Sequence, residues 1–498
     1  MSTSRKAAIV GAGPVGSLSA IVLAKRGWSV SLYEGRPDPR LPSSKEAARL
    51  RSINLAISHR GICAINAIDP EVAKRFLEAV VPMRGRMIHH LDGKLDSQLY
   101  DRDGQCINSV DRSLLNEALL EEVIGLPNVK VFFQHKLEHV DFEKKTMTLK
   151  DLSTGQDVSA DFDFCIGADG AFSTVRRQMM RVVRMNYQQE YIRDQYIELK
   201  LSAGRDADGY PTFQLDPNHL HIWPRHSFML IALPNQDKTF TCTLFAPSSE
   251  LDRLRTPEEI LTWFKLHFSD AVSLIGEKEL LRDFTSNPRS PLICTKSNPY
   301  HYLDRALLLG DAAHAMVPFY GQGLNCGLED VRILDILLKE EGVTSTTVVP
   351  SGSIDDRLAR ALCRYSETRH EDLVAICDLA MNNYIEMRHL VTSPLFLFKK
   401  ALDNALYYLS SRRDMSFDAF NTVLSHLPYG FGEPRGWVPL YTMVTFRPDI
   451  NYATAKKRAA RQSGILTGIG WASVAVVASL GVWTVRAARL TLLHRSQA

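Results

Sequence analysis

Closely spaced cysteines are missing from this chain. Its eight cysteines are scattered over 498 residues, and no two of them form a Cys-x-x-Cys motif. Structural zinc sites commonly use such closely spaced cysteines, and disulfide frameworks are typical of short secreted chains that are dense in cysteine. The pattern therefore predicts reduced intracellular thiols and no metal site.

The chain also has little net charge and no convincing internal repeat. Its formal charge is +3 at pH 7, with 45% hydrophobic and 23% charged residues. This composition argues against wholesale disorder and gives no reason to expect a nucleic-acid partner. We expect no signal peptide before the first strand, which begins by about Ala7. A chain of this length predicts two or three lobes.

What the chain does contain is a glycine motif between a strand pattern and a helix pattern. An apolar run, residues 7–10, predicts a buried strand, and Gly-x-Gly-x-x-Gly follows it at once. Gly11 permits a tight turn, Gly13 lets backbone approach a pyrophosphate, and Gly16 allows close helix–strand packing. Glu34 ends the next expected strand, where its carboxylate can bind an adenosine ribose and disfavours a 2′-phosphate. Together these features predict dinucleotide binding, without separating NAD from FAD.

Residues 306–330 form a second motif, around which we expect the rest of the chain to be organised. Its apolar start predicts a buried strand that ends at Gly310-Asp311, and Gly321-Gln322-Gly323-Leu324-Asn325 precedes a helix pattern. The Asp311 carboxylate can accept a hydroxyl of a sugar–phosphate chain. Glycines before a helix expose backbone N–H groups, and the helix N-terminus adds about half a positive charge. Such a site suits a flavin, although an ordinary strand–loop–helix unit is the alternative.

Two further stretches could belong to the same site. Residues 162–166 predict a strand that leads into Gly167-Ala168-Asp169-Gly170. There Asp169 can orient the loop and Arg176 or Arg177 could meet a phosphate, whereas a simple capped turn is the alternative. Residues 49–60 are basic around an apolar centre, and they could lie beside the cofactor or form a solvated loop.

Strand patterns dominate two other regions. Residues 83–110 alternate around Asp-Gly turn signals, and residues 196–245 predict an antiparallel sheet inserted into the α/β domain. Asp111 and Thr256 are expected to cap helices, with Leu114 packed inward.

The C-terminal part has a helical pattern that ends in an apolar segment. Residues 464–485 carry no charge and have basic residues on both flanks. Their length and apolar character predict a transmembrane tail anchor, with a buried helix as the alternative.

Taken jointly, the three nucleotide-type motifs resemble the single-component FAD-dependent aromatic hydroxylases. Within that group the resemblance narrows to the kynurenine 3-monooxygenase family, and it runs from about residue 5 to about residue 446. The segments that carry it are residues 51–61, 82–89, 187–192, 219–225, 383–388 and 439–446. Two features depart from the family: Tyr320 stands where a second phenylalanine is common, and residues 410–436 form a longer segment than usual.

The resemblance implies a Rossmann-like α/β FAD-binding domain with an inserted antiparallel substrate sheet. The implied domains are 1–185 for FAD, with part of the substrate sheet near 83–110, then 186–299 for the substrate sheet, 300–342 for the FAD-binding Gly-Asp segment, 355–455 for a helical region and 464–485 for the membrane anchor. The implied FAD contacts are Gly11, Gly13, Val15, Gly16, Glu34, Gly35, Ala56, Arg112, Leu137, Thr174, Asp311, Gly323, Leu324 and Asn325.

The resemblance also implies a substrate site for L-kynurenine. Arg86, Tyr100, Asn383 and Tyr441 would hold its amino-acid end, and Phe319, Tyr320 and Gln322 would lie near its aromatic ring and the flavin. The implied reaction is reduction of non-covalent FAD by NADPH, followed by oxygen transfer from a flavin C4a-hydroperoxide to the ring, giving 3-hydroxykynurenine. No residue is assigned as a general acid or base, because the ring's amino group already activates it.

Two other function classes stay open at this point, besides an FAD hydroxylase of another aromatic substrate. A disulfide-reducing flavoenzyme would need a cysteine pair near the flavin, whereas Cys63, Cys165 and Cys326 are isolated in the sequence. A non-catalytic, membrane-bound flavin-fold module would need no substrate residues. The expected location is the mitochondrial outer membrane, with the catalytic body in the cytosol.

Overall fold

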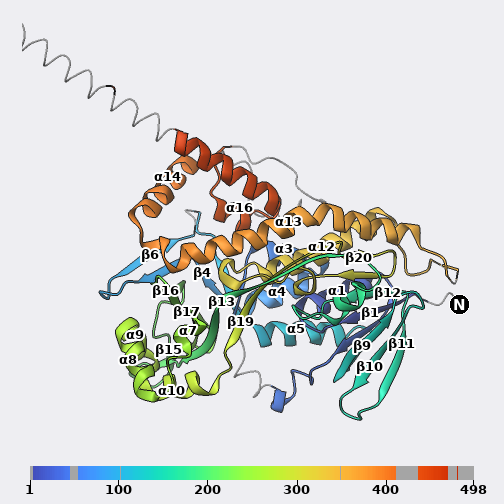
Figure 1. The fold of residues 1–498 in the computed structure, drawn as a ribbon, viewed down its shortest axis with the longest axis horizontal. Coiled ribbons are helices and arrows are strands. Elements are labelled where there is room, and N and C mark those ends of the chain that lie inside the picture. Colours follow the sequence, from blue (N-terminus) through green and yellow to red (C-terminus); the bar gives the residue numbers. More distant parts are fainter. Residues whose placement is uncertain are drawn as a thin grey trace, which may run out of the picture.

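The protein is organised around two large β-sheets, with helices on the faces of both (Figure 1). A computed structural model describes residues 4–44, 54–100, 103–347, 349–350, 352–410, 436–468 and 479. The first sheet is mainly parallel and the second mainly antiparallel.

The parallel sheet is built from strands that lie far apart in the sequence. In order across the sheet they are β20 (His301–Tyr302), β21 (Ala306–Leu308), β12 (Phe164–Gly167), β1 (Lys6–Val10), β2 (Ser29–Glu34) and β8 (Val129–Phe133). All except the edge strand β20 run parallel. The inner strands β1, β12 and β21 are buried along almost their whole length, which explains their apolar runs in the sequence.

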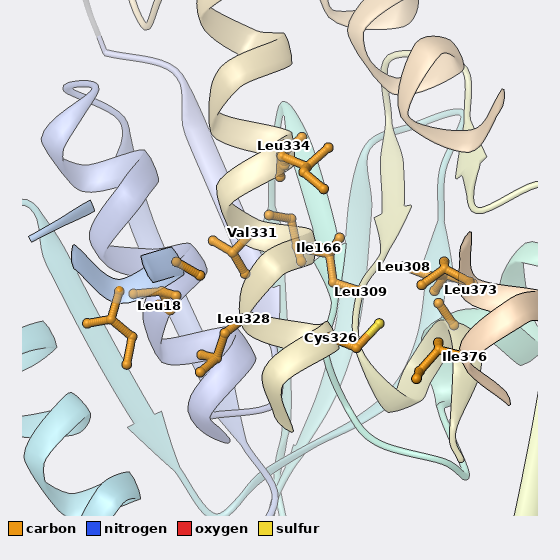
Figure 2. Close-up of a cluster of buried hydrophobic side chains, with 14 of the residues drawn as sticks. Leu18, Ile166, Leu308, Leu309, Cys326, Leu328, Val331, Leu334, Leu373 and Ile376 are labelled. Atoms are coloured by element: carbon orange, nitrogen blue, oxygen red, sulfur yellow. The ribbon is translucent and has the colours of Figure 1, made fainter. Parts of the chain in front are cut away.

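Three helices pack together over this sheet. They are α1 (Pro14–Lys25), α12 (Gly323–Glu340) and α13 (Asp356–Arg388). Figure 2 shows α12 between α1 and α13, with Leu328 and Val331 on the α1 side and Cys326 toward Ile376 of α13. The core formed this way continues into strands β12 and β21 and fixes the start of α12 relative to the strand ends.

The second large sheet has seven strands. In order they are β19 (Ser290–Asn298), β13 (Asn186–Leu201), β18 (Phe240–Pro247), β17 (Phe228–Pro234), β16 (His219–Arg225), β5 (Gly85–His89) and β6 (Leu95–Leu99). One pairing, between β16 and β5, is parallel, with His219 opposite Gly85. One face of this sheet shares a separate apolar core with four helices, namely α7 (Ser248–Leu251), α8 (Pro257–His267), α9 (Ser269–Ile275) and α10 (Glu277–Ser286).

Smaller elements connect these sheets. The strands are β3 (Asn54–Ile57), β4 (Val81–Met83), β7 (Ile107–Asp111), β9 (His135–Asp141), β10 (Thr146–Asp151), β11 (Asp157–Asp161), β14 (Gly204–Arg205) and β15 (Pro211–Thr212). The helices are α3 (His59–Ile68), α4 (Pro70–Glu78), α5 (Arg112–Ile124), α6 (Thr174–Met179), α11 (Asp311–His314), η1 (Pro318–Tyr320), η2 (Leu390–Thr392), α14 (Pro394–Ser410) and α16 (Leu440–Phe446).

Local signals in the sequence located several helix starts correctly. The Asp111 carboxylate accepts hydrogen bonds from the N–H groups of Ser113 and Leu114 at the start of α5. Thr256 and Glu259 form the expected reciprocal capping box at the start of α8. The inward packing predicted for Leu114 is wrong, because its side chain is exposed on α5.

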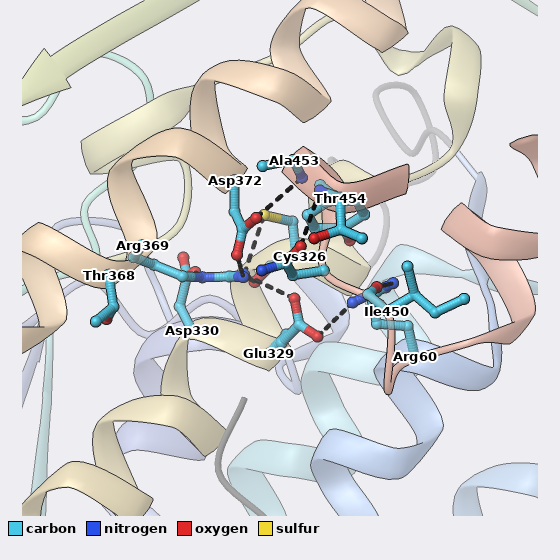
Figure 3. A network of polar contacts seen from close by, with 12 residues as sticks. Arg60, Cys326, Glu329, Asp330, Thr368, Arg369, Asp372, Ile450, Ala453 and Thr454 are labelled. Carbon is cyan, nitrogen blue, oxygen red and sulfur yellow. Dashed lines mark hydrogen bonds and ion pairs between the residues drawn. The ribbon is translucent and has the colours of Figure 1, made fainter. Parts of the chain in front are cut away.

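A buried ion network joins four segments of the chain (Figure 3). Arg369 of α13 donates from Nε to Asp330 at 2.9 Å and pairs with Glu329 at 2.8 Å. Arg60 of α3 pairs with the other oxygen of Glu329 at 2.6 Å and donates to the Ile450 carbonyl at 2.7 Å. Burial opposes ionisation here, but the charges of Arg60 and Arg369 hold the pKa of Glu329 below its ordinary value.

The sequence left open whether residues 49–60 lie beside the cofactor or form a solvated loop, and the position of Arg60 bears on this question. Residues 54–60 are not a solvated loop, since they run from β3 into the start of α3, and Arg60 is 1% exposed. The Ala56 carbonyl and the Ser58 N–H both bond to Asn325 of α12, so a place beside the cofactor stays a prediction. Residues 49–53 of the same stretch lie outside the described residues.

His314, Cys326 and Asp330 lie close enough together to resemble a metal site, since one potential ligand atom of each falls within 4.8 Å of the others. A guanidinium occupies this position, because Arg369 donates to Asp330 and to the Cys326 sulfur at 3.5 Å. The second Asp330 oxygen pairs with His314 Nε2 at 2.5 Å and accepts the Gly310 N–H at 3.1 Å. The cluster therefore belongs to the ion network.

The predicted transmembrane helix is wrong. Within the part of the chain that the structure describes, no helix is long and apolar enough to cross a membrane. The described C-terminal helix covers residues 452–468, and its basic residues include Lys456, Lys457 and Arg461. Most of residues 464–485 lies outside the described residues. The prediction depended on the absence of charge, while glycines at 468, 470 and 481 weaken the apolar character.

The ion network makes a prediction about Asp372. Burial raises the pKa of its carboxyl to about 6, and one of its oxygens accepts the Ala453 N–H at 3.0 Å. Because the folded pKa exceeds the unfolded value of about 3.9, stability falls as pH rises from about 4 to about 6 and stays low above that. Asn keeps the acceptor without the charge. We expect Asp372→Asn to raise the free energy of unfolding at pH 7.5 by about 1–3 kcal/mol, with a smaller gain at pH 5.

Urea unfolding of the cofactor-loaded protein at both pH values measures this effect. Asp378→Asn is the matched control on the same helix, because Lys296 and Lys456 hold the pKa of Asp378 below its ordinary value against the opposing effect of burial. That control should lose stability at pH 7.5. A destabilised Asp372→Asn protein at pH 7.5 would mean that Arg369 depends on a charged Asp372.

Candidate functional site

The three motifs predicted from the sequence meet at the carboxyl ends of neighbouring strands. Backbone hydrogen bonds extend the ladder beyond the strands, from Leu309 N–H to the Gly167 carbonyl at 3.0 Å and from Ala168 N–H to the Val10 carbonyl at 2.8 Å. Gly11 N–H continues it to the Tyr33 carbonyl at 2.7 Å. Loops from four strands therefore converge where open α/β sheets bind ligands.

The first glycine motif is required by close backbone contacts. Gly11 has φ +102°, and a Cβ there would lie 2.3 Å from the Ala168 carbonyl oxygen. A Cβ on Gly16 would lie 1.9 Å from the Gly11 carbonyl oxygen. At Gly13 a Cβ would meet nothing within 4 Å, so the loop faces open space there. No side chain caps the N-terminus of α1, which leaves its N–H groups for a ligand.

Glu34 is held against this loop by the backbone. One carboxylate oxygen accepts the Ala12 N–H and the other accepts the Arg36 N–H, both at 2.9 Å. Each oxygen keeps a lone pair for a ribose hydroxyl. Gly35 follows, and a Cβ on it would lie 3.7 Å from Lys136, the residue before Leu137 in β9. Leu137 itself is buried, so its side chain belongs to the core.

Asp311 presents its carboxylate at the end of β21. The residue is exposed, although Gly310 and Ala312 on either side are buried. Gly310 has φ +57°, and a Cβ there would lie 3.1 Å from Val15. Val15 of α1 thus packs against Gly310 in the second motif. The Asp311 side chain faces outward.

Asn325 fastens the loop before α12. Its amide nitrogen donates to the Gly321 carbonyl at 2.6 Å and to the Ala56 carbonyl at 2.9 Å. Its oxygen accepts the Ser58 N–H at 2.8 Å. Gly323 and Leu324 begin α12, whose N-terminus has no side-chain cap. Asn325 therefore shapes the loop, and the backbone at the start of α12 is left for a ligand.

The third motif is held by Asp169 and Arg176. Asp169 accepts the Thr174 N–H at 2.7 Å, and Ser173 caps α6. Arg176 donates to the carbonyls of Ala312 at 2.7 Å and Ala171 at 2.6 Å, so it ties this loop to the Asp311 segment. This use of Arg176 differs from the predicted phosphate contact.

Arg112 lies apart from these loops in the sequence. It is the first residue of α5 and is exposed. Its positive charge acts on Glu198 of β13, but burial dominates there and raises the pKa of Glu198 to about 7.

Arg86 forms the charged end of a second set of residues. It is 6% exposed and pairs through Nη1 with Glu386 at 3.2 Å. Burial opposes its charge, but Glu386 keeps the pKa of Arg86 above its ordinary value. The guanidinium carbon lies 5.3 Å from the ring centre of Tyr441 and 5.9 Å from that of Tyr100. Arg86 Nε is buried without a partner among the described residues, so it can still donate to an anion.

Stacked aromatic rings connect this end with the α12 loop. Tyr441 lies between Tyr100 and Tyr320, at ring-centre distances of 5.0 and 5.6 Å and with interplanar angles of 11° and 16°. Phe319 stacks on Tyr384 at 4.1 Å, and its carbonyl accepts the Asn383 amide at 2.7 Å. The set is therefore apolar in its walls and charged at one end.

Gln322 links the substrate residues with the cofactor loop before α12. This side chain is 1% exposed, and its oxygen accepts the Tyr452 hydroxyl at 3.1 Å. It directly precedes Gly323, where α12 begins. The predicted substrate residues are thus brought together by α13, α16 and the loop before α12.

Sequence reasoning missed two residues here, Glu386 and Tyr384. Glu386 and Asn383 are three residues apart on α13, which places them on one helix face, and this spacing was a usable signal. The ring contact of Tyr384 depends on tertiary packing. Residues 411–435 of the long segment noted in the sequence lie outside the described residues.

Comparison with known proteins decides the family. A model of the FAD binding domain family matches residues 4–342. A kynurenine 3-monooxygenase of Cryptococcus neoformans var. neoformans serotype D is 44% identical and covers 99% of both chains. The chain belongs to the kynurenine 3-monooxygenase family. Relatives of the same name from Yarrowia lipolytica and Saccharomyces cerevisiae are each 42% identical, covering 95% and 93% of this chain and 96% and 94% of theirs.

Solved structures show the fold that this family shares with other flavin hydroxylases. A 2-methyl-3-hydroxypyridine-5-carboxylic acid oxygenase has a TM-score of 0.59 at 20% identity, covering 81% of this chain and 97% of its own. A p-nitrophenol 4-monooxygenase of Pseudomonas putida has a TM-score of 0.56 at 19% identity, covering 86% and 98%. The aromatic hydroxylase fold expected from the sequence is thus present, apart from the transmembrane helix.

The cofactor of this kynurenine 3-monooxygenase family member is FAD, with NADPH as co-substrate. Its residues fit an FAD, because Gly13 faces open space, two helix N-termini lack side-chain caps, and Asp311 projects outward between buried neighbours. The roles of the individual residues stay predictions.

We predict that Asp311→Ala lowers FAD occupancy. The change removes a hydroxyl acceptor at the end of β21 without disturbing the buried Gly310 beside it. Loss of one hydrogen bond to a charged group corresponds to about 1.5–3 kcal/mol, or roughly 10- to 100-fold weaker FAD binding. The readout is the ratio of flavin absorbance to protein after purification, with flavin released by acid precipitation.

Asp356→Ala is the matched control, since Asp356 is also an exposed aspartate in the first turn of a helix, α13. It should leave FAD occupancy unchanged. Full FAD occupancy and unaltered affinity in Asp311→Ala would remove Asp311 from the cofactor site.

Proposed function

We propose that this chain hydroxylates L-kynurenine to 3-hydroxykynurenine, with FAD as bound cofactor and NADPH and O2 as co-substrates. Arg86 is the observation that carries this proposal, because it is a buried cation at the end of an aromatic-walled site. L-kynurenine combines an aromatic amine with an amino-acid carboxylate, so it matches both parts of the site.

The substrate carboxylate can accept a hydrogen bond from Arg86. Arg86 uses Nη1 for Glu386, while its buried Nε has no partner among the described residues. A guanidinium can donate two parallel hydrogen bonds to a carboxylate, which fixes direction as well as affinity. Fixing the carboxylate also fixes how far the aromatic ring reaches toward the α12 loop.

The aromatic residues position the other end and exclude water. Tyr320 and Phe319 are 7% and 6% exposed, and both lie in the loop directly before Gly321 and α12. Asn383 holds this loop through the Phe319 carbonyl. Stacked rings favour a planar aromatic substrate in a dry site.

When bound, FAD supplies the redox chemistry, taking electrons from NADPH and activating oxygen for transfer to the ring. The chain's own residues bind, orient and desolvate the substrate. The ring position ortho to the amino group is already electron-rich, so the proposal assigns no side chain as acid or base.

The three cysteines expected near the flavin give no support to a disulfide-reducing enzyme. Cys63, Cys165 and Cys326 lie on α3, β12 and α12. Burial raises the pKa of Cys63 to about 12 and raises the pKa values of the other two thiols well above the ordinary value. Protonated thiols are poor nucleophiles.

Product analysis of the purified protein with NADPH, oxygen and L-kynurenine tests the function. We expect 3-hydroxykynurenine in proportion to NADPH consumed. NADPH oxidation without a hydroxylated product would contradict the reaction, and product from a different aromatic acid alone would identify another substrate. Absence of any kynurenine-stimulated NADPH oxidation would favour a non-catalytic module.

Arg86→Met should leave FAD content normal and collapse turnover of kynurenine. Methionine preserves much of the side-chain length but loses the charge and the hydrogen bonds. Removing a buried charged partner costs about 2–5 kcal/mol, which is roughly 30- to several-thousand-fold in kcat/KM. Steady-state kinetics at low kynurenine measures it.

Arg84→Met serves as the control, because Arg84 is two residues away and exposed. Its kcat/KM should match that of the unaltered protein. A loss below about threefold in Arg86→Met is too small for a buried ion pair and would contradict the assignment.

The location at the mitochondrial outer membrane, with the catalytic body in the cytosol, stays a prediction. Fractionation of cells should recover the protein with mitochondria, and protease added to intact mitochondria should digest it. Recovery in another fraction, or protection from the protease, would contradict this location.

A further inference from the structure

Two buried histidines lie on the face of the seven-stranded sheet that is turned away from Arg86. Side chains alternate along a strand, so Arg86 and His89 of β5 project from opposite faces. His89 is 3% exposed and His221 of β16 is 2% exposed. Trp223, two residues after His221, packs into the core that this face shares with α8 and α9, and these helices lie together at one end of the molecule (Figure 1).

The two histidines belong to a continuous chain of hydrogen bonds. His221 Nε2 lies 2.9 Å from the Asp216 carbonyl oxygen, and its Nδ1 lies 2.9 Å from His89 Nε2. His89 Nδ1 in turn lies 3.1 Å from Asp270 Oδ2 of α9. Trp223 Nε1 donates to the same Asp270 oxygen at 2.7 Å. The hydrogen bonds therefore join the segment before β16, both strands and α9.

The number of protons in these contacts follows from the two ends. A carbonyl oxygen and a carboxylate only accept hydrogen bonds, so the three contacts from Asp216 to Asp270 need three protons. Two neutral imidazoles carry two such protons in total. The geometry therefore requires one additional proton, which turns one imidazole into an imidazolium.

The surroundings place this additional proton on His89. Burial lowers the pKa of the His221 imidazole to about 4, so His221 stays neutral. The His89 ring stacks on Trp223 at a ring-centre distance of 3.9 Å and an angle of 25°, which favours a cation over the indole face. Burial opposes ionisation of Asp270, but the hydrogen bonds from His89 and Trp223 hold its pKa below its ordinary value.

Further titratable and charged groups surround these contacts. Arg225 of β16 donates to the His89 carbonyl at 3.0 Å and to the His267 carbonyl of α8 at 2.6 Å. His219 pairs with the Asp216 carboxylate at 2.8 Å. The positive charge of Arg225 disfavours a proton on His89, whereas the α9 carboxylate in direct contact favours it. That carboxylate side chain is 37% exposed, so the proton can exchange with solvent.

We propose that His89, His221 and Asp270 form a site for one proton, which joins α9 to β5 and keeps Arg86 in position. Without the proton, the bare His89 nitrogen and the carboxylate would face each other with lone pairs on both. Their repulsion would disturb β5, which carries Arg86 three residues before His89. Release of the proton then weakens binding of a carboxylate at Arg86. The proton site stands on its own geometry, and its effect on kynurenine rests on the proposed function.

Raising the pH should weaken the joint between α9 and β5. An unfolded histidine releases its proton near pH 6.5, whereas the folded site keeps the additional proton. Above about pH 6.5 the folded protein thus binds one proton more, so the contribution of this site to stability falls as pH rises. His221 acts in the opposite direction below about pH 6.5, because its lowered pKa favours the unfolded state there. The comparison is therefore made between pH 6.5 and pH 9.

Urea unfolding of the FAD-loaded protein tests the proton site. Asp270→Asn keeps an acceptor for Trp223 and removes the charge that holds the proton. Its urea midpoint should lie below that of the unaltered protein at pH 6.5, and the gap should narrow by pH 9. His89→Gln, a second variant without a titrating ring, should show the same narrowing. Asp356→Asn is the matched control in the first turn of α13, where Asp356 is exposed, and it should show no narrowing.

Calorimetry with L-kynurenine on the FAD-loaded protein tests the effect on Arg86. We expect the affinity of the unaltered protein to fall by up to about tenfold from pH 6.5 to pH 9, the equivalent of one pKa unit. Asp270→Asn should bind more weakly at pH 6.5 and lose much of this pH dependence, while Asp356→Asn should keep it. Titration of the ligand's own amino group is common to all variants, so the difference between variants is the measure.

The two measurements fail in different ways. A urea gap that is equal at both pH values in Asp270→Asn and His89→Gln would mean that no additional proton is bound, and it would overturn the inference. A narrowing gap with the same pH dependence of kynurenine binding in every variant would overturn the link to Arg86. If the unaltered protein binds no kynurenine at either pH, the proposed function fails, and the urea comparison still decides the proton site.

Discussion

The buried pairing of Arg369 with Glu329 and Asp330 is the interaction on which the rest of the structure depends. These carboxylates lie on α12, shortly after Gly323 and Asn325 in its first turn, and the arginine lies on α13, about four turns before Asn383. The nucleotide end and the substrate end of the molecule are thereby fixed to one another. Asp330 reaches further, since it also accepts the Gly310 N–H at the end of β21. Removing one partner from such a network leaves a buried charge uncompensated.

The placement of charge explains why this core is polar at its centre. Arg60 brings α3 and the segment around Ile450 into the same network, and the Tyr452 ring lies 4.2 Å from its guanidinium carbon. Tyr452 in turn donates to Gln322 at the beginning of α12. A purely apolar core would tolerate small shifts of α12 against α13, whereas paired charges and directed hydrogen bonds have few acceptable geometries. Precise spacing between cofactor loop and substrate residues follows from that.

Much of the fold could be predicted from the sequence because its signals are local. The strand at residues 7–10, the glycines after it and the caps at Asp111 and Thr256 each depend on a few neighbouring residues. The ion network could not be predicted, because Arg60, Glu329 and Arg369 are joined only in three dimensions. For that reason the sequence leaves Arg60 either beside the cofactor or in a solvated loop. The transmembrane prediction failed because lack of charge was given more weight than the glycines in the segment. Residue roles in the site came from the family resemblance, whereas the ring contact of Tyr384 emerged only from packing.

The parallel pairing of β5 with β16 has a consequence for how the chain reaches its native state. Residue 85 pairs with residue 219, and residue 186 at the start of β13 pairs with residue 298 at the end of β19. Strands from both sides of the third motif thus complete one sheet, so no single cut divides the chain into two self-sufficient folding units. Such long-range pairings require large loops to close before any stabilising contact forms. This entropic cost slows folding. During synthesis, β5, which carries Arg86, leaves the ribosome long before its partner strand β16 has been made. In that interval its unpaired edge is exposed, and chaperones bind such exposed edges.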